Sequence, residues 1–204
     1  MKQFWGLVFV MLLGGPVWAA DCVEYKKIPR IIFNTPDWQQ VVVQPREPMD
    51  LWHGNVVATL VDNYDVVVDV TPVADGFCVG LKTVNATVGY SDFVVQVDIR
   101  HTPNTCAYDA IVAHENKHIK TYLDVMDSFK PELQQSVFRA ADSVMPIFVA
   151  KKQDADAAVD MINNEMQNHP ELVLVKQKIR AAQEIENKQV DINENGAELA
   201  KCVD

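Results

Sequence analysis

The stretch FVVQVDIRHTPNTCAYDAIVAHENKHIKTYLDVM, residues 93–126, decides the fold. Its first part carries apolar side chains at every second position from Phe93 to Ile99, which is typical of a half-buried strand. From Asn104 onward the apolar spacing becomes helical, and this predicts a helix over 106–127. A strand that leads directly into an amphipathic helix predicts an α+β fold.

More β-rich runs precede this stretch. Short gaps rich in Asp, Asn and Gly separate them, and such gaps are hairpin signals. Together with a strand at 93–100, the runs predict an antiparallel β meander of about four strands. The segment 21–54 is expected to be irregular, apart from a β-like run at 41–43. The β-rich runs are 55–61, 65–72 and 77–88, and the gaps are 62–63, 74–76 and 89–92.

Long helices are expected after the meander. The first helix should break at 128–131, because Pro131 fits the first turn of a new helix. Helical periodicity continues from there to 168, with Pro146 expected to kink or interrupt it, and a last helix is expected over 171–192. The chain is thus expected to have three parts: a signal peptide at 1–20, a β meander plus helix at 21–130, and a helical C-terminal region at 131–204.

The segment 1–20 has the features of a secretory signal peptide. Lys2 supplies the positive start, and an apolar run from Phe4 to Leu13 precedes small residues and a cleavage point after Ala19 or Ala20. The run is shorter than the roughly 20 residues that span a bilayer. An uncleaved anchor is the alternative. We therefore expect a periplasmic or secreted protein with no stable membrane span after cleavage.

The four cysteines, Cys22, Cys78, Cys106 and Cys202, are expected to form two disulfides. Export favours disulfides, and the absence of a C-x-x-C spacing argues against a thiolate metal site. Cys78 and Cys106 flank one predicted hairpin region, which favours pairing them and leaves Cys22 with Cys202. Three pairings remain open, because connectivity does not follow from sequence.

The formal charge of −10 bears on the partners. An acidic chain repels nucleic acid and anionic membrane surfaces. No basic patch with interleaved aromatic residues counters this charge. We expect no nucleic-acid partner.

The motif AHENKHI, residues 113–119, carries the clearest chemistry. Residues i and i+4 of a helix lie on one face, so His114 and His118 can hold one Zn²⁺ at about 2.0–2.1 Å. Glu115 lies in the apolar arc of this helix, where a carboxylate is costly without a partner. From there it can take a proton from a water whose pKa the metal lowers to about 7.

The block from Cys78 to about Asp124 resembles the zincin metallopeptidases. More narrowly, it is similar to small exported bacterial proteins predicted to be zinc-dependent proteases of unknown substrate. The resemblance implies that His114 and His118 are zinc ligands and that Glu115 is the general base. The matching residues are Ala113, His114, Glu115, His118 and Ile119.

A catalytic zinc site usually has three protein ligands, and the third is open here. The metzincin spacing points to Asp124, but Thr121 stands where that pattern needs a glycine. A ligand from the following helix points to Asp142, if the two helices form a hairpin near 129–130. His101 and Glu165 are further candidates.

Two functions are consistent with these patterns. The first is an exported zinc metallopeptidase that hydrolyses a peptide or protein substrate with a water activated by Zn²⁺, in a cleft beside strand 93–100. The alternative is a non-catalytic periplasmic binding or structural protein that recruits a partner through helices at 131–168 and 171–192.

Overall fold

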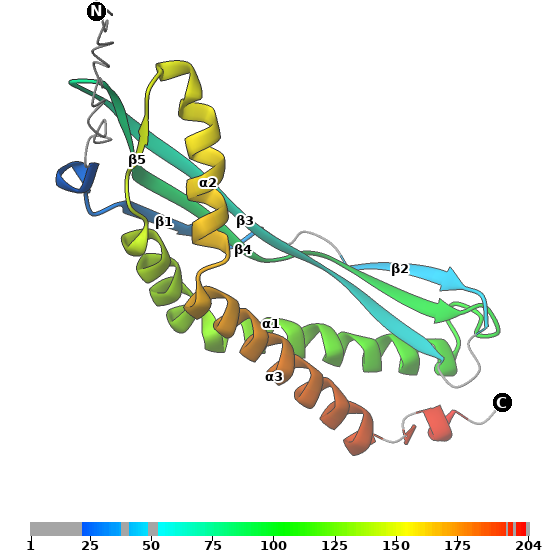
Figure 1. Cartoon of the computed structure of the whole chain (residues 1–204). Coiled ribbons are helices and arrows are strands. Elements are labelled where there is room, and N and C mark those ends of the chain that lie inside the picture. Colours follow the sequence, from blue (N-terminus) through cyan, green and yellow to red (C-terminus); the bar gives the residue numbers. More distant parts are fainter. Residues whose placement is uncertain (1–21, 38–40, 49–52, 195, 198, 203–204) are drawn as a thin grey trace, which may run out of the picture.

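The computed structural model describes residues 22–37, 41–48, 53–194, 196–197 and 199–202. The predicted signal peptide at 1–20 lies outside the described residues. The fold is α+β. Figure 1 shows a long, twisted sheet with helices packed along it.

One long β hairpin forms the frame of the sheet. Strands β3 (Gly54–Val73) and β4 (Gly76–Asp98) run antiparallel and pair along their whole length. Ala74 and Asp75 form the turn between them, where the Asp-Gly sequence predicts one.

The expected four-stranded antiparallel meander is wrong. The segments 62–63 and 89–92, read as turns, lie inside β3 and β4. The pairing shifts between Thr59 and Leu60, so that Ser91 is an extra residue on β4. Such a β-bulge accommodates residues that also favour turns. Gly89, at a φ of 150°, lies beside this bulge.

Three short strands line the other side of β4, so that β4 is the central strand and β3 is an edge. Two of them run parallel to β4, which a meander does not allow. Their residues had been expected to be mostly irregular. In order along β4 the strands are β5 (Ile147–Val149, antiparallel), β1 (Arg30–Asn34, parallel) and β2 (Val41–Arg46, parallel).

Helix α1 (Cys106–Ser143) follows β4 and is capped by the Thr105 side chain, which accepts a hydrogen bond from the Tyr108 N–H. The expected break at 128–131 is wrong, because α1 continues through Pro131. A proline inside a helix costs about 3 kcal/mol. Buried Met126 and Leu133 flank Pro131, and their packing offsets that cost.

The later helices follow the sequence more closely, but the helical periodicity expected over 147–154 is wrong, because β5 and a short 3-10 turn lie there. α1 ends before Pro146, α2 spans Ala155–Gln167, and α3 spans Pro170–Glu194. The break expected between the helical stretches that end at 168 and begin at 171 is therefore confirmed. Short 3-10 turns complete the chain: η1 (Cys22–Tyr25), η2 (Lys152–Asp154) and η3 (Leu199–Lys201).

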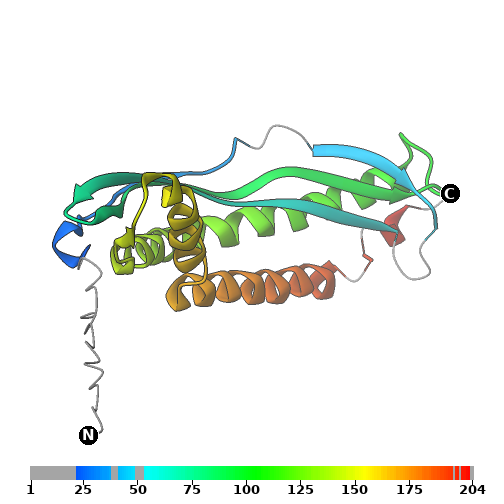
Figure 2. The ribbon, with the colours of Figure 1, turned by 45° about the horizontal axis from the view of Figure 1, so that its top comes forward.

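The core lies between the sheet and the helices. Figure 2 shows α1 and α3 on the same face of the sheet. Apolar side chains of β4, α1, α2 and α3 form one buried cluster there. The largest fully buried members include Tyr64, Phe93, Leu133, Ile162, Met166 and Leu172.

Two disulfides cross-link the chain: Cys22–Cys78 joins η1 to the start of β4, and Cys106–Cys202 joins the start of α1 to the residue after η3. All four cysteines are paired as expected, but the favoured pairing is wrong. Cys78 lies near the start of β4, and Cys106 is the first residue of α1, beyond the other end of β4, whose 23 residues at about 3.3 Å per residue span on the order of 75 Å. Disulfides fit a protein exported to an oxidising compartment. Among the described residues, no helix has both the length and the apolar character needed to cross a membrane.

Candidate metal centre

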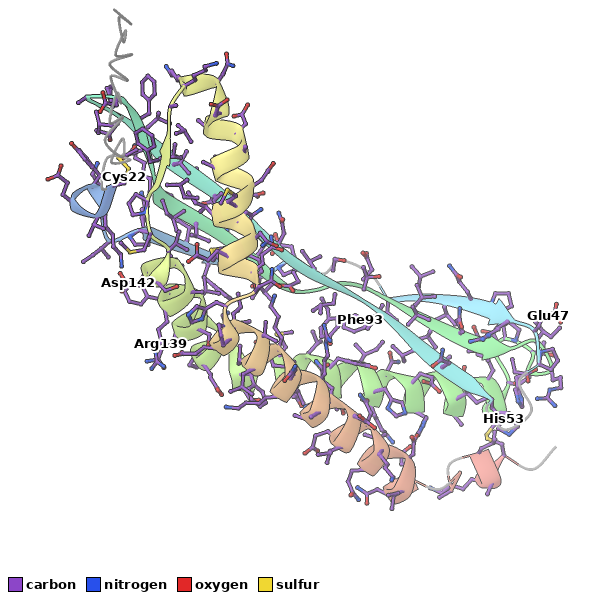
Figure 3. All side chains as sticks on the ribbon, viewed as in Figure 1. Cys22, Glu47, His53, Phe93, Arg139 and Asp142 are labelled. Atoms are coloured by element: carbon purple, nitrogen blue, oxygen red, sulfur yellow. A yellow bond between two sulfur atoms is a disulfide. The ribbon has the colours of Figure 1, made fainter. Side chains whose placement is uncertain are left out.

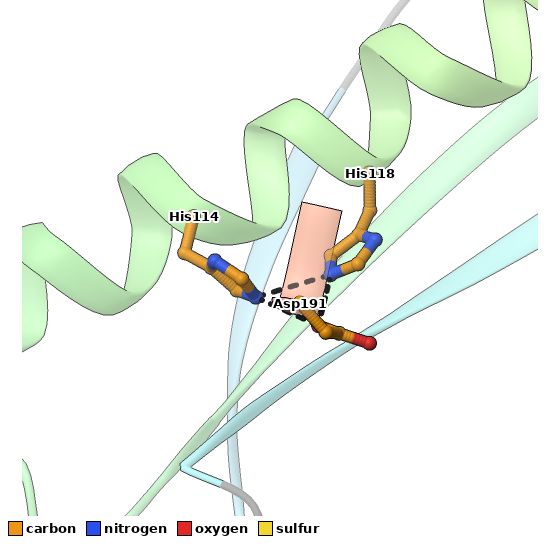
Figure 4. Close-up of side chains that lie close together, drawn as sticks. All are labelled: His114, His118 and Asp191. Atoms are coloured by element: carbon orange, nitrogen blue, oxygen red, sulfur yellow. Dashed lines mark hydrogen bonds and ion pairs between the residues drawn. The ribbon is translucent and has the colours of Figure 1, made fainter. Parts of the chain in front are cut away.

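Three ligand atoms from two helices converge beside the sheet. His114 and His118 project from α1, and Asp191 projects from the last turns of α3 (Figure 4). Asp191 Oδ1 lies 3.2 Å from His114 Nε2 and 3.1 Å from His118 Nε2. The two Nε2 atoms are 3.1 Å apart. The three residues form a group that could hold a metal ion.

The outer nitrogen of each imidazole faces a partner on α3. His114 Nδ1 lies 2.8 Å from Glu194 Oε2, and His118 Nδ1 lies 2.8 Å from Asn187 Oδ1. Both partner atoms are acceptors, so each Nδ1 carries the proton and donates it. In the neutral rings each Nε2 is then an acceptor. Partners of this kind fix the orientation of metal-binding histidines.

With both rings neutral, the three inner atoms are all acceptors. Such a set is electrostatically unfavourable unless a proton or a metal cation lies among them. Ligand atoms about 2.0–2.1 Å from a tetrahedral Zn²⁺ are about 3.3–3.4 Å apart, close to the 3.1–3.2 Å found here. Two imidazoles and one carboxylate are also a common ligand set of catalytic zinc sites.

Glu115 points inward beside the two histidines, as its place in the apolar arc predicts. It is only 5 % exposed. A Cβ atom on Gly54 would lie 2.5 Å from Glu115 Oε1, so the carboxyl group occupies the space that Gly54 leaves. Burial raises the pKa of the Glu115 carboxyl, against opposing effects of His118 and His114.

A cleft of ≈ 400 Å³ opens over these residues. Its lining comes from the start of β3, from α1 and from α3, and it includes the two histidines, Glu115 and Asp191. A substrate in this cleft would contact both polar and apolar groups. The remaining lining residues are Gly54, Asn55, Val56, Tyr122 and Asn187.

Lys117 adds a cation at the rim. It forms an ion pair with Glu194, the residue that also holds His114. Partial burial raises the pKa of Glu194, but Lys117 and His114 outweigh it and leave the pKa below its usual range. Glu194 is therefore an ionised acceptor for His114 at neutral pH.

Neither favoured third ligand reaches the histidines. Because α1 does not break at Pro131, Asp142 lies on the same helix 24 residues after His118, about 36 Å away along its axis. Figure 3 shows Asp142 at the end of α1 that lies far from His53. Asp124 is exposed and pairs with Lys120. Both assignments are wrong.

The remaining candidates are also elsewhere. His101 Nε2 lies 2.9 Å from His53 Nδ1, and Glu165 is exposed on α2. Asp191 was missed because it is 73 residues from His118. A signal for it exists in α3. The apolar stripe at Leu172, Val175 and Ile179 continues on the same face as the polar series Gln183, Asn187, Asp191 and Glu194.

The arrangement can bind a divalent cation through two imidazoles and a carboxylate, with a buried carboxylate beside it. The cleft leaves one side of this cluster accessible, as in catalytic rather than structural zinc sites. Residues and geometry alone support this assignment, because the chain matches no protein-family model, no curated protein and no solved structure.

Proposed function

We propose that this protein is an exported zinc-dependent hydrolase that cleaves peptide bonds. One observation carries the proposal. His114 Nε2, His118 Nε2 and Asp191 Oδ1 converge within 3.2 Å of one another, with both outer ring nitrogens donating to α3. The buried carboxyl group of Glu115 lies next to them.

His114, His118 and Asp191 would hold the ion, and Glu194 and Asn187 would keep the two imidazoles oriented toward it. Bound Zn²⁺ would polarise the substrate carbonyl and lower the pKa of a coordinated water to about 7. Three protein ligands leave a fourth position for that chemistry.

Glu115 is the residue that would move the proton. Its carboxylate would accept a proton from the attacking water and then donate it to the leaving amine. The absence of a side chain on Gly54 lets this carboxyl group lie against the strand. The raised pKa of Glu115 brings it closer to the pH at which a general base works best.

The substrate would lie along β3. The cleft was expected beside strand 93–100, but that strand belongs to β4, which has partners on both sides. Gly54, Asn55 and Val56 begin the edge strand β3 and line the cleft. An extended peptide can add to such an edge through backbone hydrogen bonds, which would bring a scissile bond past Glu115.

Metal analysis of the purified mature protein tests the site. We expect about one zinc per chain in the wild type, and loss of zinc in His114→Ala and Asp191→Ala. Asp142→Ala and Asp124→Ala are matched controls, since both remove a carboxylate outside the cluster, and each should retain zinc. Zinc that is absent from the wild type, or retained in Asp191→Ala, would contradict the proposal.

Hydrolysis of a mixed peptide library, read by mass spectrometry, tests the reaction. The wild type should give new termini and Glu115→Gln should not, although both bind zinc. Zinc binding without hydrolysis would instead support the alternative, a non-catalytic exported module that recruits a partner through its helices.

A further inference from the structure

The end of α3 that carries the site has little packing of its own. The buried residues of α3 are Leu172, Val175, Ile179 and Gln183. The structure describes every α3 residue after Gln183, and none of them is buried. Of the apolar residues at this end, Ile185 and Ile192 are 66 % and 58 % exposed, and Val190 is only half-buried.

This end nevertheless supplies every α3 residue of the metal centre. Asn187, Asp191 and Glu194 all come after the last buried position. Helix ends with few buried apolar contacts open most easily. The polar contacts with α1 are partly exposed, and such pairs contribute little by themselves. Some other link must hold the end of α3 in place.

The Cys106–Cys202 disulfide is that link. Cys106 is the first residue of α1, eight residues before His114, and Cys202 comes eight residues after Glu194. η3, between Glu194 and Cys202, contacts α1. The disulfide therefore closes a loop that begins with α1 and contains α3. Within this loop the two helices face each other at the metal ligands.

The second disulfide has no such position. Cys22–Cys78 joins η1 to the start of β4, and Figure 3 shows Cys22 at the opposite end of the molecule from His53. Removing it leaves α1 and the end of α3 linked. Removal of Cys22–Cys78 is therefore a matched control for removal of Cys106–Cys202.

We propose that the Cys106–Cys202 disulfide makes metal binding conditional on oxidation: the centre is complete only when this bond holds the end of α3 against α1. In a reducing compartment the end of α3 opens away from α1 more readily and the ion binds more weakly, so the proposed hydrolase becomes fully competent after export. This inference rests on the proposed function for the use of the metal, but the coupling itself concerns binding alone.

Reduction of this bond is an ordinary exchange with a dithiol. The two thiols of the reductant form a new disulfide, the Cys106–Cys202 bond breaks, and each cysteine sulfur takes up one proton and one electron. The end of α3 is then tethered only through its own helix. Coupling between two sites is reciprocal, so a bound ion should also disfavour this reduction.

Zinc affinity of paired variants tests the coupling. We expect C106A/C202A to bind Zn²⁺ roughly 10- to 100-fold more weakly than the wild type, the range seen when supporting partners of ligands are lost. C22A/C78A should bind as the wild type does. Competition with a chromogenic chelator measures both affinities, and alanine avoids binding by free thiols. Equal affinity in the two variants overturns the inference.

Amide hydrogen exchange of the zinc-free wild type gives a second measurement, which does not depend on how well the variants fold. Reduction of Cys106–Cys202, confirmed by alkylation and mass spectrometry, should speed exchange over 184–194 and leave 172–183 protected. Unchanged exchange over 184–194 overturns the inference. Absence of zinc binding by the wild type overturns the proposed function, while the exchange experiment still decides whether the disulfide holds α3.

Discussion

The two ends of the hairpin are held together in different ways. At the end near Cys22, α2 and the first half of α3 bury Ile162, Met166 and Leu172 completely. At the end near His53, the second half of α3 contacts α1 through His114, His118 and their acidic and amide partners. Apolar burial holds α3 in place at the first end, whereas at the second end the contact between α3 and α1 is made mainly by polar groups.

This contrast teaches where the fold can carry a site. Polar side chains facing each other between two helices are costly unless each finds a partner. Departures of this kind from an apolar interface are characteristic of functional positions. Well-packed apolar residues at the other end allow the site end to be assembled from weak contacts and a covalent link.

The largest expected effect comes from a substitution that stops hydrolysis at the site end and leaves both ends folded. Glu115→Gln should lower peptide hydrolysis by roughly 10²- to 10⁴-fold, the usual contribution of a general base. Zinc content and melting temperature should stay close to those of the wild type. Activity retained in this variant would remove Glu115 from the reaction.

A substitution in the apolar core of the end near Cys22 should lower stability and leave zinc affinity unchanged. Ile162→Ala removes a fully buried side chain and should lower the free energy of unfolding by about 2–5 kcal/mol. Urea unfolding measures this loss. Zinc affinity, measured well below the unfolding transition, should not change. A parallel loss of zinc affinity would mean that the two ends are not independent.

Loss of a polar contact at the site end should lower zinc affinity and leave stability almost unchanged. Asn187→Ala removes the acceptor for His118 Nδ1, so zinc affinity should fall by roughly 10- to 100-fold. The free energy of unfolding of the zinc-free protein should change little. Gln189→Ala, an exposed change on the same helix, is the control and should leave affinity as it is.

The pH dependence of the zinc-free protein sharpens the comparison. Burial raises the pKa of Glu115 in the folded chain. The contribution of Glu115 to the free energy of unfolding is therefore fully present below its pKa in the unfolded chain. It is lost as the pH rises through its pKa in the folded chain. Zinc-free Glu115→Gln should be more stable than zinc-free wild type at neutral pH, by about 1 kcal/mol, and the difference should shrink toward pH 4. A difference that grows on acidification would contradict this.

The smallest effect is expected at an exposed ion pair between the same two helices. Arg139 on α1 and Glu171 on α3 are 2.8 Å apart and both largely exposed. Arg139→Ala should cost less than about 1 kcal/mol and should not alter zinc affinity. A double-mutant cycle with Glu171→Ala measures the pair. A larger coupling energy would show that exposed contacts also hold α3.

Sequence patterns predicted the local features of this molecule. Periodicity placed a strand and a helix on either side of Asn104, and the Asp-Gly pair placed the hairpin turn. The inward position of Glu115 followed from its place among Ile111 and Tyr122. Each of these depends on residues that are neighbours along one element.

Features that depend on distant pairing were not predictable in this way. The parallel strands β1 and β2, the partner of each cysteine and the ligand Asp191 all require knowing which segments meet. Pro131 misled the prediction for a related reason, since burial on both sides of it overrides its local preference. One error propagated, because a hairpin at Pro131 was the basis for choosing Asp142.

The central position of β4 has a consequence for how the protein is made. Within the described part of the chain every other strand pairs with β4 alone, and β1 and β2 precede it by roughly 50 residues in the register they adopt. These two strands emerge from the ribosome before their partner is synthesised, and β5 arrives after it. Long-range pairing of this kind folds slowly. A chain that stays unfolded until β4 is complete is still in a form that can be threaded across a membrane, which fits the proposed export.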